Sequence, residues 1–394
     1  MAPKDVQSSL VQISPDHVRR RRDIITCSNS SNSFTFGVIT DVQWADAPDG
    51  SNYTKTVKRH YRGSFRNLRD AVDYWNSLDD VQFIAQLGDL IDGSNRRTPA
   101  ESDRALSLAL DQLSRVSNGN CPSVNLVGNH ELYNFNRQEL ALASWLRHGD
   151  SEYYSFIPAR SWRVVVLDPY QISLIGHSCD DPRRHEAVEI MKRENPNVSS
   201  DGTDGNWFEG IEGYQRRFCP YNGGYGPQQL EWFRNELQNA AAEEERVLVM
   251  SHTIIHPKAC GGNTMAWDYE QALAIIHESS SSKDSSVVVA VLCGHDHSGN
   301  YHCDECGVHH CTFMSPLNKG DDGSAFGLIH VTPDCMEIRG PKLDDFLPNV
   351  EGRPEILKCF GGDELLMLPI RPVAISSTTL TRQKAMAAGA KGAV

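Results

Sequence analysis

Short apolar segments recur along the chain and alternate with longer segments of helical periodicity. The apolar segments are rich in β-branched residues and nearly continuous, which is typical of strands buried on both faces. They span residues 34–40, 81–87, 123–127, 162–167, 246–250 and 287–292. Helical patterns lie at 64–78, 103–116, 227–245 and 268–279. Strands that alternate with helices in this way predict a layered α/β fold.

Three segments depart from this alternation. Residues 1–33 are polar, contain four consecutive arginines and predict a disordered N-terminal tail. Residues 171–226 are rich in Gly, Asn, Asp and Pro with interspersed aromatics, and predict a loop-rich insertion that caps the substrate side of a site. Residues 341–394 show few periodic signals and predict a partly disordered C-terminal extension. The catalytic domain is therefore expected at 34–340.

Composition narrows the class of protein. The chain has 394 residues, 39% hydrophobic and 23% charged, which is an ordinary globular mixture. A formal charge of −13 argues against a general nucleic-acid binder. No apolar run is long enough to span a membrane, and the first residues lack the apolar segment of a secretory signal. With an odd number of cysteines, 11, these features predict a cytoplasmic, monomeric protein with reduced thiols.

Candidate metal ligands follow five of the six apolar segments. In open α/β sheets the carboxyl ends of the strands form the edge where ligands bind. A neighbouring glycine lets the backbone turn sharply and approach an ion closely. The side chains delivered to this edge are Asp41 and Gln43, Asp89 and Asp92, Asn129 and His130, His252, and finally His295 and His297.

The chemistry of this set points to a pair of divalent cations. The donors are oxygen and nitrogen without thiolate, which suits ions of intermediate hardness such as Mn, Fe, Co or Zn. Two-metal sites hold their ions about 3.5–4 Å apart, and a shared carboxylate can bridge such a pair. A pair of this kind acidifies a water and clamps a phosphoryl group for in-line attack.

The order of these motifs resembles the calcineurin-like metallophosphoesterases. The pattern D-x-[HQ], GD-x-x-D, GNH-[ED], SH and GHxH covers residues 34–335. The resemblance implies a four-layer α/β/β/α sandwich. It also implies one ion held by Asp41, Gln43, Asp89 and His297, and a second held by Asp89, Asn129, His252 and His295. The same resemblance makes His130 a general acid or charge stabiliser, supported by Asp92.

One position departs from the common pattern. Gln43 stands where most members have histidine, and an amide oxygen is a harder and weaker ligand, so the first ion should lean towards Mn or Mg. The alternative is an inactive, half-occupied site. Within the family, the segment 41–50, DVQWADAPDG, is similar to the manganese-dependent ADP-ribose/CDP-alcohol diphosphatases. Further similar segments are 222–233, 266–276, 307–310 and 324–331.

That branch implies hydrolysis of a phosphoanhydride bond. The substrates would be ADP-ribose and CDP-alcohols (CDP-choline, CDP-ethanolamine, CDP-glycerol), attacked by a metal-bridging hydroxide to give AMP or CMP plus a phosphorylated sugar or alcohol. The alternatives are a cyclic-nucleotide phosphodiesterase or phosphoprotein phosphatase on the same fold, and a scaffold that has lost catalysis. The 41–50 loop counts against the first two, and the complete ligand set counts against the third.

Weaker signals remain open. Tyr53 follows the 41–50 loop and is a candidate to stack on a base, although an ordinary packed tyrosine fits equally well. Tyr225 and Trp267 are weaker candidates for substrate contact. The histidine-rich segment 301–311 also contains Cys303, Cys306 and Cys311, whose chemistry is compatible with zinc. We favour a reduced loop that borders the active site, because a second well-spaced ligand pair is missing. His256 is interpreted as a loop residue rather than a ligand.

Overall fold

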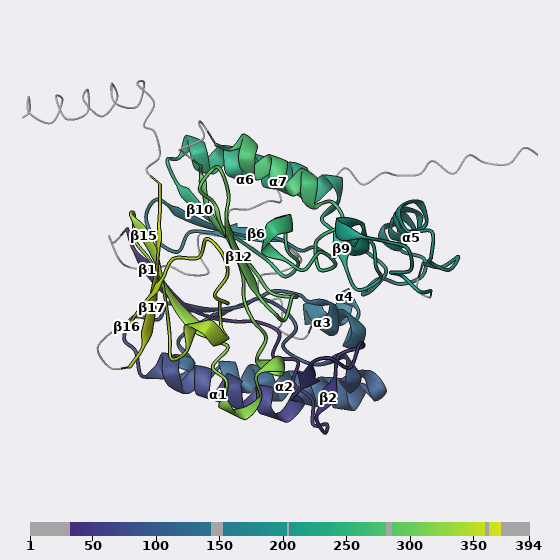
Figure 1. Cartoon of the computed structure of the whole chain (residues 1–394), viewed down its shortest axis with the longest axis horizontal. Helices are drawn as coiled ribbons and strands as arrows, with labels where there is room; N and C mark the ends of the chain where they lie inside the picture. The colour runs from purple at the N-terminus through teal and green to yellow at the C-terminus, as the bar shows by residue number, and fades with distance from the viewer. Residues whose placement is uncertain (1–31, 143–152, 203–204, 281–285, 359–361, 372–394) are drawn as a thin grey trace, which may run out of the picture.

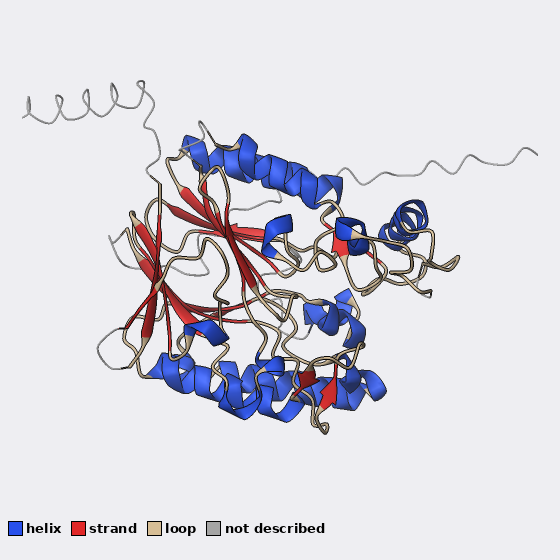
Figure 2. Ribbon diagram, viewed as in Figure 1, coloured by secondary structure: helices blue, strands red, loops and turns tan. Residues whose placement is uncertain are grey.

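Two β-sheets face each other, and helices cover their outer faces (Figures 1 and 2). The computed structural model describes residues 32–142, 153–202, 205–280, 286–358 and 362–371. The predicted N-terminal tail therefore lies almost wholly outside the described residues. Four layers result, in the order helix, sheet, sheet, helix, which confirms the predicted α/β/β/α sandwich.

The first sheet has seven strands and the second has six. The seven-stranded sheet runs in the order β16 (Ile356–Lys358), β17 (Glu364–Pro369), β15 (Cys335–Gly340), β14 (Gly327–Val331), β1 (Phe34–Ile39), β4 (Phe83–Gln86), β5 (Ser123–Asn125). The six-stranded sheet runs in the order β12 (Asn300–Cys303), β13 (His309–Thr312), β11 (Val288–Cys293), β10 (Arg246–Ser251), β7 (Trp162–Val166), β6 (Tyr154–Phe156). β1, β4 and β5 are mutually parallel, and so are β7, β10, β11 and β13, so each sheet collects several carboxyl ends at one edge.

The helices that cover the sheets are α1 (Tyr61–Asn76) and α2 (Pro99–Leu113) on the first, and α6 (Gly226–Ala242) and α7 (Tyr269–Glu278) on the second. Each begins within four residues of the start expected from its periodicity. Smaller elements gather around the strand ends, on the right in Figure 1. They are the hairpin β2 (Gly50–Ser51) and β3 (Lys58–Arg59), α3 (Asn129–Asn134), α4 (Arg137–Leu142), and the pair β8 (Ile172–Ser173) and β9 (Gly223–Gly224).

Aromatic side chains join the two sheets in the central core. Phe36 of β1 and Phe83 of β4 stack with ring centroids 4.7 Å apart. Across the sandwich, Phe34 meets Trp162 of the second sheet edge to face, with the centroids 5.6 Å apart. Burial of large aromatic rings contributes most of the energy of such cores. This core fixes the two sheets relative to each other, and with them the two sets of strand ends.

Two segments contain regular structure that the sequence patterns did not indicate. The loop-rich insertion 171–226 contains the 13-residue helix α5 (Pro182–Glu194) with Asp181 as its N-cap. The segment after residue 340 is not only an extension, because β17 pairs with β15 along its whole length and buries Leu366 and Leu368. The sheet of the catalytic domain therefore continues to Pro369 rather than ending at the predicted boundary.

Candidate dinuclear metal centre

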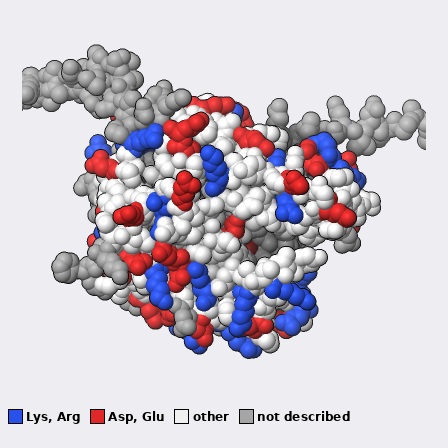
Figure 3. Space-filling model, in the orientation of Figure 1, with Lys and Arg blue, Asp and Glu red and all other residues white. Residues whose placement is uncertain are grey.

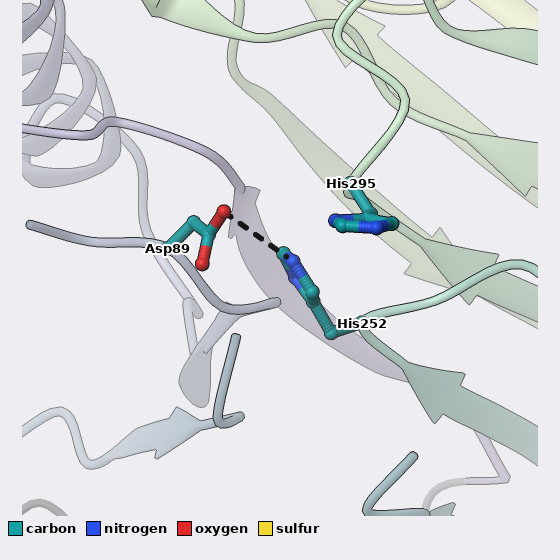
Figure 4. A group of neighbouring side chains, drawn as sticks. All are labelled: Asp89, His252 and His295. Atoms are coloured by element: carbon teal, nitrogen blue, oxygen red, sulfur yellow. Dashed lines mark ion pairs between the residues drawn. The ribbon is translucent and has the colours of Figure 1, made fainter. Parts of the chain in front are cut away.

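The loops that follow β1, β4, β10 and β11 bring acidic and imidazole groups to one place. One group is Asp89, His252 and His295, whose ligand atoms all lie within 4.8 Å of one another (Figure 4). A second group, with the same spacing limit, is Asp41, Asp89 and His297. Asp89 belongs to both groups, as a carboxylate shared between two ions requires. The other candidate ligand, Asn129, begins α3 next to this carboxylate, and the backbone N–H of His130 donates to Asp89 Oδ1 at 2.8 Å.

The backbone at this edge is strained. Asp41, Gln43, Asp89 and His295 have φ angles of 50°, 45°, 56° and 67°, in the left-handed region that side chains other than glycine seldom adopt. Such conformations cost about 1–3 kcal/mol each and persist where the surrounding structure enforces them, often at functional sites. Hydrogen bonds hold them here: the backbone N–H of Asp41 donates to the carbonyl oxygen of Gly88 at 3.0 Å, and that of Asp89 donates to Glu131 Oε2 at 2.8 Å. The loops therefore adopt an unfavourable backbone conformation that directs the candidate ligand side chains towards one another.

Three buried ligand atoms of the centre have no hydrogen-bond partner among the described residues: Asp41 Oδ1, Gln43 Oε1 and His252 Nε2. His252 Nδ1 lies 2.7 Å from the carbonyl oxygen of Leu87 and donates its proton there. His252 Nε2 therefore faces Asp89 Oδ2 at 3.5 Å. Unpaired buried acceptors are costly without a compensating partner, so this arrangement fits bound cations.

Gln43 acts as a donor in this structure. Its Nε2 donates to Asp89 Oδ2 at 3.0 Å and lies 2.9 Å from His297 Nε2. To serve as a ligand, the amide must make a half turn about its last torsion, which exchanges the positions of oxygen and nitrogen. That turn would place the oxygen beside Asp89 and His297, among the ligands expected for the first ion.

Charge in the centre is balanced between carboxylates and imidazoles. Burial alone would raise the pKa of Asp89, but the neighbouring His252 and His130 outweigh it and hold that pKa below its usual range. Burial would lower the pKa of His252, but Asp89 and Asp41 raise it to about 9. Burial and the charge of His252 lower the pKa of His295 to about 3. Metal binding therefore has to displace a proton from His252, while His295 is already neutral.

His130 stands beside the shared carboxylate. Its Nε2 lies 4.0 Å from Asp89 Oδ2, and its Nδ1 accepts from the backbone N–H of Gly93 at 2.8 Å. Asp92 Oδ2 lies 3.2 Å from the same Nδ1, so Asp92 is positioned to support His130 when the ring is protonated. Burial would lower the pKa of His130, but Asp89 and Asp92 raise it.

Three supporting residues were not identified from the sequence. Buried Glu131 accepts hydrogen bonds from the backbone N–H groups of Asp89, Leu90 and Gly128 and so fixes the loop after β4. Its position after His130 in the GNH-[ED] motif was the one sequence signal that could have identified it. Asn222 Oδ1 accepts from His295 Nε2 at 2.7 Å, which leaves Nδ1 of His295 for a metal ion. Tyr170 donates its hydroxyl to Asn129 Oδ1 at 3.4 Å.

Two of the predicted substrate contacts are buried side chains that lie apart from the candidate ligands. Tyr225 is 1% exposed, because it precedes α6 in the helix–sheet core and its hydroxyl pairs with Ser251 Oγ. Trp267 is 3% exposed and packs on Phe218, beside a cavity of about 290 Å³ that none of the candidate ligands lines. Tyr53, by contrast, is 99% exposed between β2 and β3, and its role stays a prediction.

A cation near the centre was also missed. Arg59 of β3 lies close enough to His130 for its charge to oppose protonation of that ring. Its Nε is buried and has no hydrogen-bond partner among the described residues. The spacing of the 41–50 loop gave no reason to single out this arginine. A buried guanidinium nitrogen beside a metal centre is suited to an anionic substrate.

Comparison with known proteins agrees with this geometry. The sequence model of the calcineurin-like phosphoesterase family matches residues 34–299. Proteins named manganese-dependent ADP-ribose/CDP-alcohol diphosphatase are similar to this chain: that of Oryza sativa is 36% identical over 80% of this chain and 94% of its own. The protein of Homo sapiens is 34% identical over 79% of this chain and 91% of its own. That of Danio rerio is 37% identical over 78% of this chain and 95% of its own. The crystal structure of a dimetal phosphatase from Danio rerio superposes with a TM-score of 0.71 at 32% identity, over 86% of this chain and 99% of that one.

Proposed function

Because this chain belongs to the calcineurin-like phosphoesterase family, in its branch of manganese-dependent ADP-ribose/CDP-alcohol diphosphatases, we propose that it hydrolyses the phosphoanhydride bond of ADP-ribose and CDP-alcohols. The products are AMP or CMP and a phosphorylated sugar or alcohol. The observation that carries the proposal is the pair of ligand groups that share Asp89, on a fold matched along almost the full length of these relatives.

The residues that hold the ions divide into two sets around Asp89. Asp41, Gln43 and His297 complete the first, and Asn129, His252 and His295 complete the second. When bound, two divalent ions supply Lewis-acid stabilisation of the phosphoryl oxygens and acidify a water. Manganese is the proposed metal, because the relatives carry it in their names and because the oxygen of Gln43 suits a harder ion than imidazole does.

His130 acts on the substrate through Nε2. Because Nδ1 accepts the N–H of Gly93, the neutral ring carries its proton on Nε2, on the side of the shared carboxylate. A hydrogen bond from this atom stabilises the charge that develops on a phosphoryl oxygen. A phosphate leaving group needs less protonation than an alkoxide, so we assign His130 mainly to charge stabilisation rather than to acid catalysis.

An anionic nucleotide is the class of substrate that the surroundings favour. Arg59 lies beside His130, and Lys and Arg side chains are frequent at the lower right of Figure 3, where Figure 1 places the β2–β3 hairpin. Elsewhere on the face drawn, cationic and anionic residues are interspersed, which does not favour a polyanion. Tyr53 at the tip of this hairpin is the proposed contact for the base.

The decisive experiment supplies metal-stripped protein with ADP-ribose or CDP-choline, with and without Mn²⁺, and identifies the products by mass spectrometry. We expect AMP plus ribose 5-phosphate, or CMP plus phosphocholine, only when metal is present. Cleavage of a cyclic nucleotide or a phosphopeptide, with neither diphosphate cleaved, would replace this proposal by one of the other phosphoesterase activities. Binding of ions without turnover of any substrate would favour the inactive scaffold. The same assay on Tyr53→Ala tests the base contact: stacking predicts loss on both nucleotides and none on a small aryl phosphodiester.

No helix in the described ranges is both long and apolar enough to cross a bilayer. The monomeric state and the cytoplasmic location, predicted from the sequence, stay predictions. A gel-filtration measurement of the full chain tests the first, since a dimer would elute at twice the mass of 43.9 kDa.

A further inference from the structure

A second cluster of metal-binding side chains lies outside the dinuclear centre. His277, in the last turn of α7, meets Asp304 and Cys306, both in the turn between β12 and β13. One ligand atom from each of the three lies within 4.8 Å of the other two. A fourth side chain, His310 of β13, contacts the same carboxylate and is buried. Asp304 therefore has an imidazole on each side, from a helix end and from the hairpin, and the Cys306 thiol belongs to the same three-residue group as Asp304 and His277.

This cluster belongs to the opposite end of the six-stranded sheet. β13 runs parallel to β11, with His310 beside Val291 and Thr312 beside Cys293. The carboxyl end of β11 leads to His295 of the dinuclear centre, so the turn that precedes β13 lies towards the amino end of β11. None of the four side chains belongs to either of the ligand groups that share Asp89. The cluster is a separate site.

The two imidazoles flank one carboxylate oxygen at distances close to those between neighbouring zinc ligands. Asp304 Oδ2 lies 3.1 Å from His277 Nε2 and 3.1 Å from His310 Nε2. In a tetrahedral zinc site with nitrogen and oxygen ligands, neighbouring ligand atoms are about 3.3 Å apart. The other oxygen of the carboxylate is committed to the turn, because Asp304 Oδ1 accepts from the backbone N–H of Val308 at 2.9 Å. The turn therefore fixes the orientation of the oxygen that faces both imidazoles.

We propose that His277, Asp304, Cys306 and His310 bind one zinc ion, which fastens α7 to the β12–β13 hairpin. Thiolate and imidazole together favour zinc over the harder manganese, so this site and the dinuclear centre select different metals. Four protein ligands leave no open position, which is the arrangement of a structural site rather than a catalytic one. β12 is the edge strand of its sheet, and such a clip holds this edge against the covering helix.

The test uses Co²⁺ as a spectroscopic substitute for zinc in the full-length protein, kept reduced with a phosphine. A cobalt–thiolate bond gives an intense near-ultraviolet charge-transfer band. The dinuclear ligand set contains no sulfur, so the band reports on this cluster alone. We expect the band in the wild type and in Asp89→Asn, and its loss on addition of one equivalent of Zn²⁺. Cys306→Ser should abolish it.

Cys303→Ser is the matched control, because Cys303 lies in the same hairpin with similar partial burial. It should keep the band, and His277→Ala should keep the band but weaken Co²⁺ binding at least about tenfold. Absence of the band in the wild type would overturn the proposal without any variant having to fold. Loss of the band in Cys303→Ser but not in Cys306→Ser would show that Cys303 rather than Cys306 is the thiolate ligand and would overturn the proposed ligand set. Either result leaves the diphosphatase activity, measured separately with Mn²⁺, untouched.

Discussion

Two clusters of polar side chains lie at opposite ends of the six-stranded sheet, and their backbones differ. At the dinuclear centre, four candidate ligands have left-handed φ angles and the side chain of His252 is fully buried. In the His277–Asp304–Cys306–His310 cluster none of the four residues has a positive φ, and the side chain of His277 is 32% exposed. The first site is held under strain by the fold, and the second is formed by an ordinary turn and a helix end.

The two clusters also differ in how their carboxylate oxygens are hydrogen-bonded. In the dinuclear centre, Asp41 Oδ1 and His252 Nε2 are buried without a hydrogen-bond partner among the described residues. In the second cluster, Asp304 uses both oxygens, one for the turn and one for the two imidazoles, while buried His310 Nδ1 has no hydrogen-bond partner among the described residues. Buried acceptors left open in a strained backbone indicate a site arranged for ligands. A carboxylate with hydrogen bonds to both oxygens, in a turn without backbone strain, indicates a site that stabilises the fold. A metal ion bound there would replace the hydrogen bonds between Asp304 and the two imidazoles.

The strongest test of this contrast is Asp89→Asn. The substitution keeps the shape of the side chain and removes the charge that both ions share, so turnover with Mn²⁺ should fall at least about a thousandfold. The cobalt–thiolate band of the second cluster should be unchanged, because no ligand is common to the two sites. Steady-state kinetics and circular dichroism check activity and folding. Activity within tenfold of the wild type would mean that Asp89 does not bridge.

His130→Ala should have the next largest effect. Loss of a hydrogen-bond donor that stabilises charge in the transition state typically lowers kcat about a hundredfold or more, while the ligands of both ions stay in place. Bound manganese, measured by mass spectrometry of the metal, should therefore stay close to the wild-type amount. A variant that loses its manganese but keeps the residual chemistry would show that His130 is a ligand rather than a group that acts on the substrate.

Asn222→Ala should weaken manganese binding about 10–100-fold, the usual range for a residue that orients a ligating histidine. Asn222 accepts from His295 Nε2, and its amide also donates to the carbonyl of Asn263. Asn222→Asp keeps an acceptor for the histidine and removes the donor, so it separates the two contributions. If metal binding by Asn222→Asp falls as far as that of Asn222→Ala, the effect comes from the insertion and not from His295.

Local patterns predicted most of what positions the site. The parallel strands and their carboxyl ends follow from continuous apolar segments, so Asp41, Asp89 and His252 were expected at one edge before any contact was known. Asn222 was not, because its contact with His295 depends on the path of the insertion across the strand ends. Helix α5 was missed because it buries few residues, although the N-cap pair Asp181-Pro182 was a usable signal.

The second cluster was not predicted as a site. The segment 301–311 was noted as compatible with zinc through Cys303, Cys306 and Cys311 but was interpreted as a reduced loop, and Cys311 is buried in the central core between the sheets. The partner that sequence spacing could not supply is His277, which comes from a helix that packs beside the hairpin only in the folded chain. The same reason explains why the burial of Tyr225 and Trp267 was not foreseen, since burial depends on tertiary packing that a local pattern does not report.

Gln43→His should have a larger effect on the metal preference of the dinuclear centre than on kcat. Imidazole is a softer ligand than an amide oxygen, so the preference for Zn²⁺ or Co²⁺ over Mn²⁺ should rise about tenfold. The variant also loses the hydrogen bond from Gln43 Nε2 to Asp89 Oδ2. Activation curves with each metal give the ratio. An unchanged ratio would show that Gln43 lies outside the coordination sphere.

The smallest effect on turnover is expected from Cys306→Ser. The cluster lies away from the strand ends that carry the dinuclear centre, so kcat with Mn²⁺ should stay within about twofold of the wild type. The cost should appear in stability instead. In the Asp89→Asn background, zinc should raise the melting temperature by at least about 3 °C, and Cys306→Ser should remove that gain. Cys303→Ser should keep it. If Cys306→Ser lowered kcat as strongly as His130→Ala does, the two ends of the sheet would be coupled, and the division into a strained catalytic site and a relaxed structural site would fail.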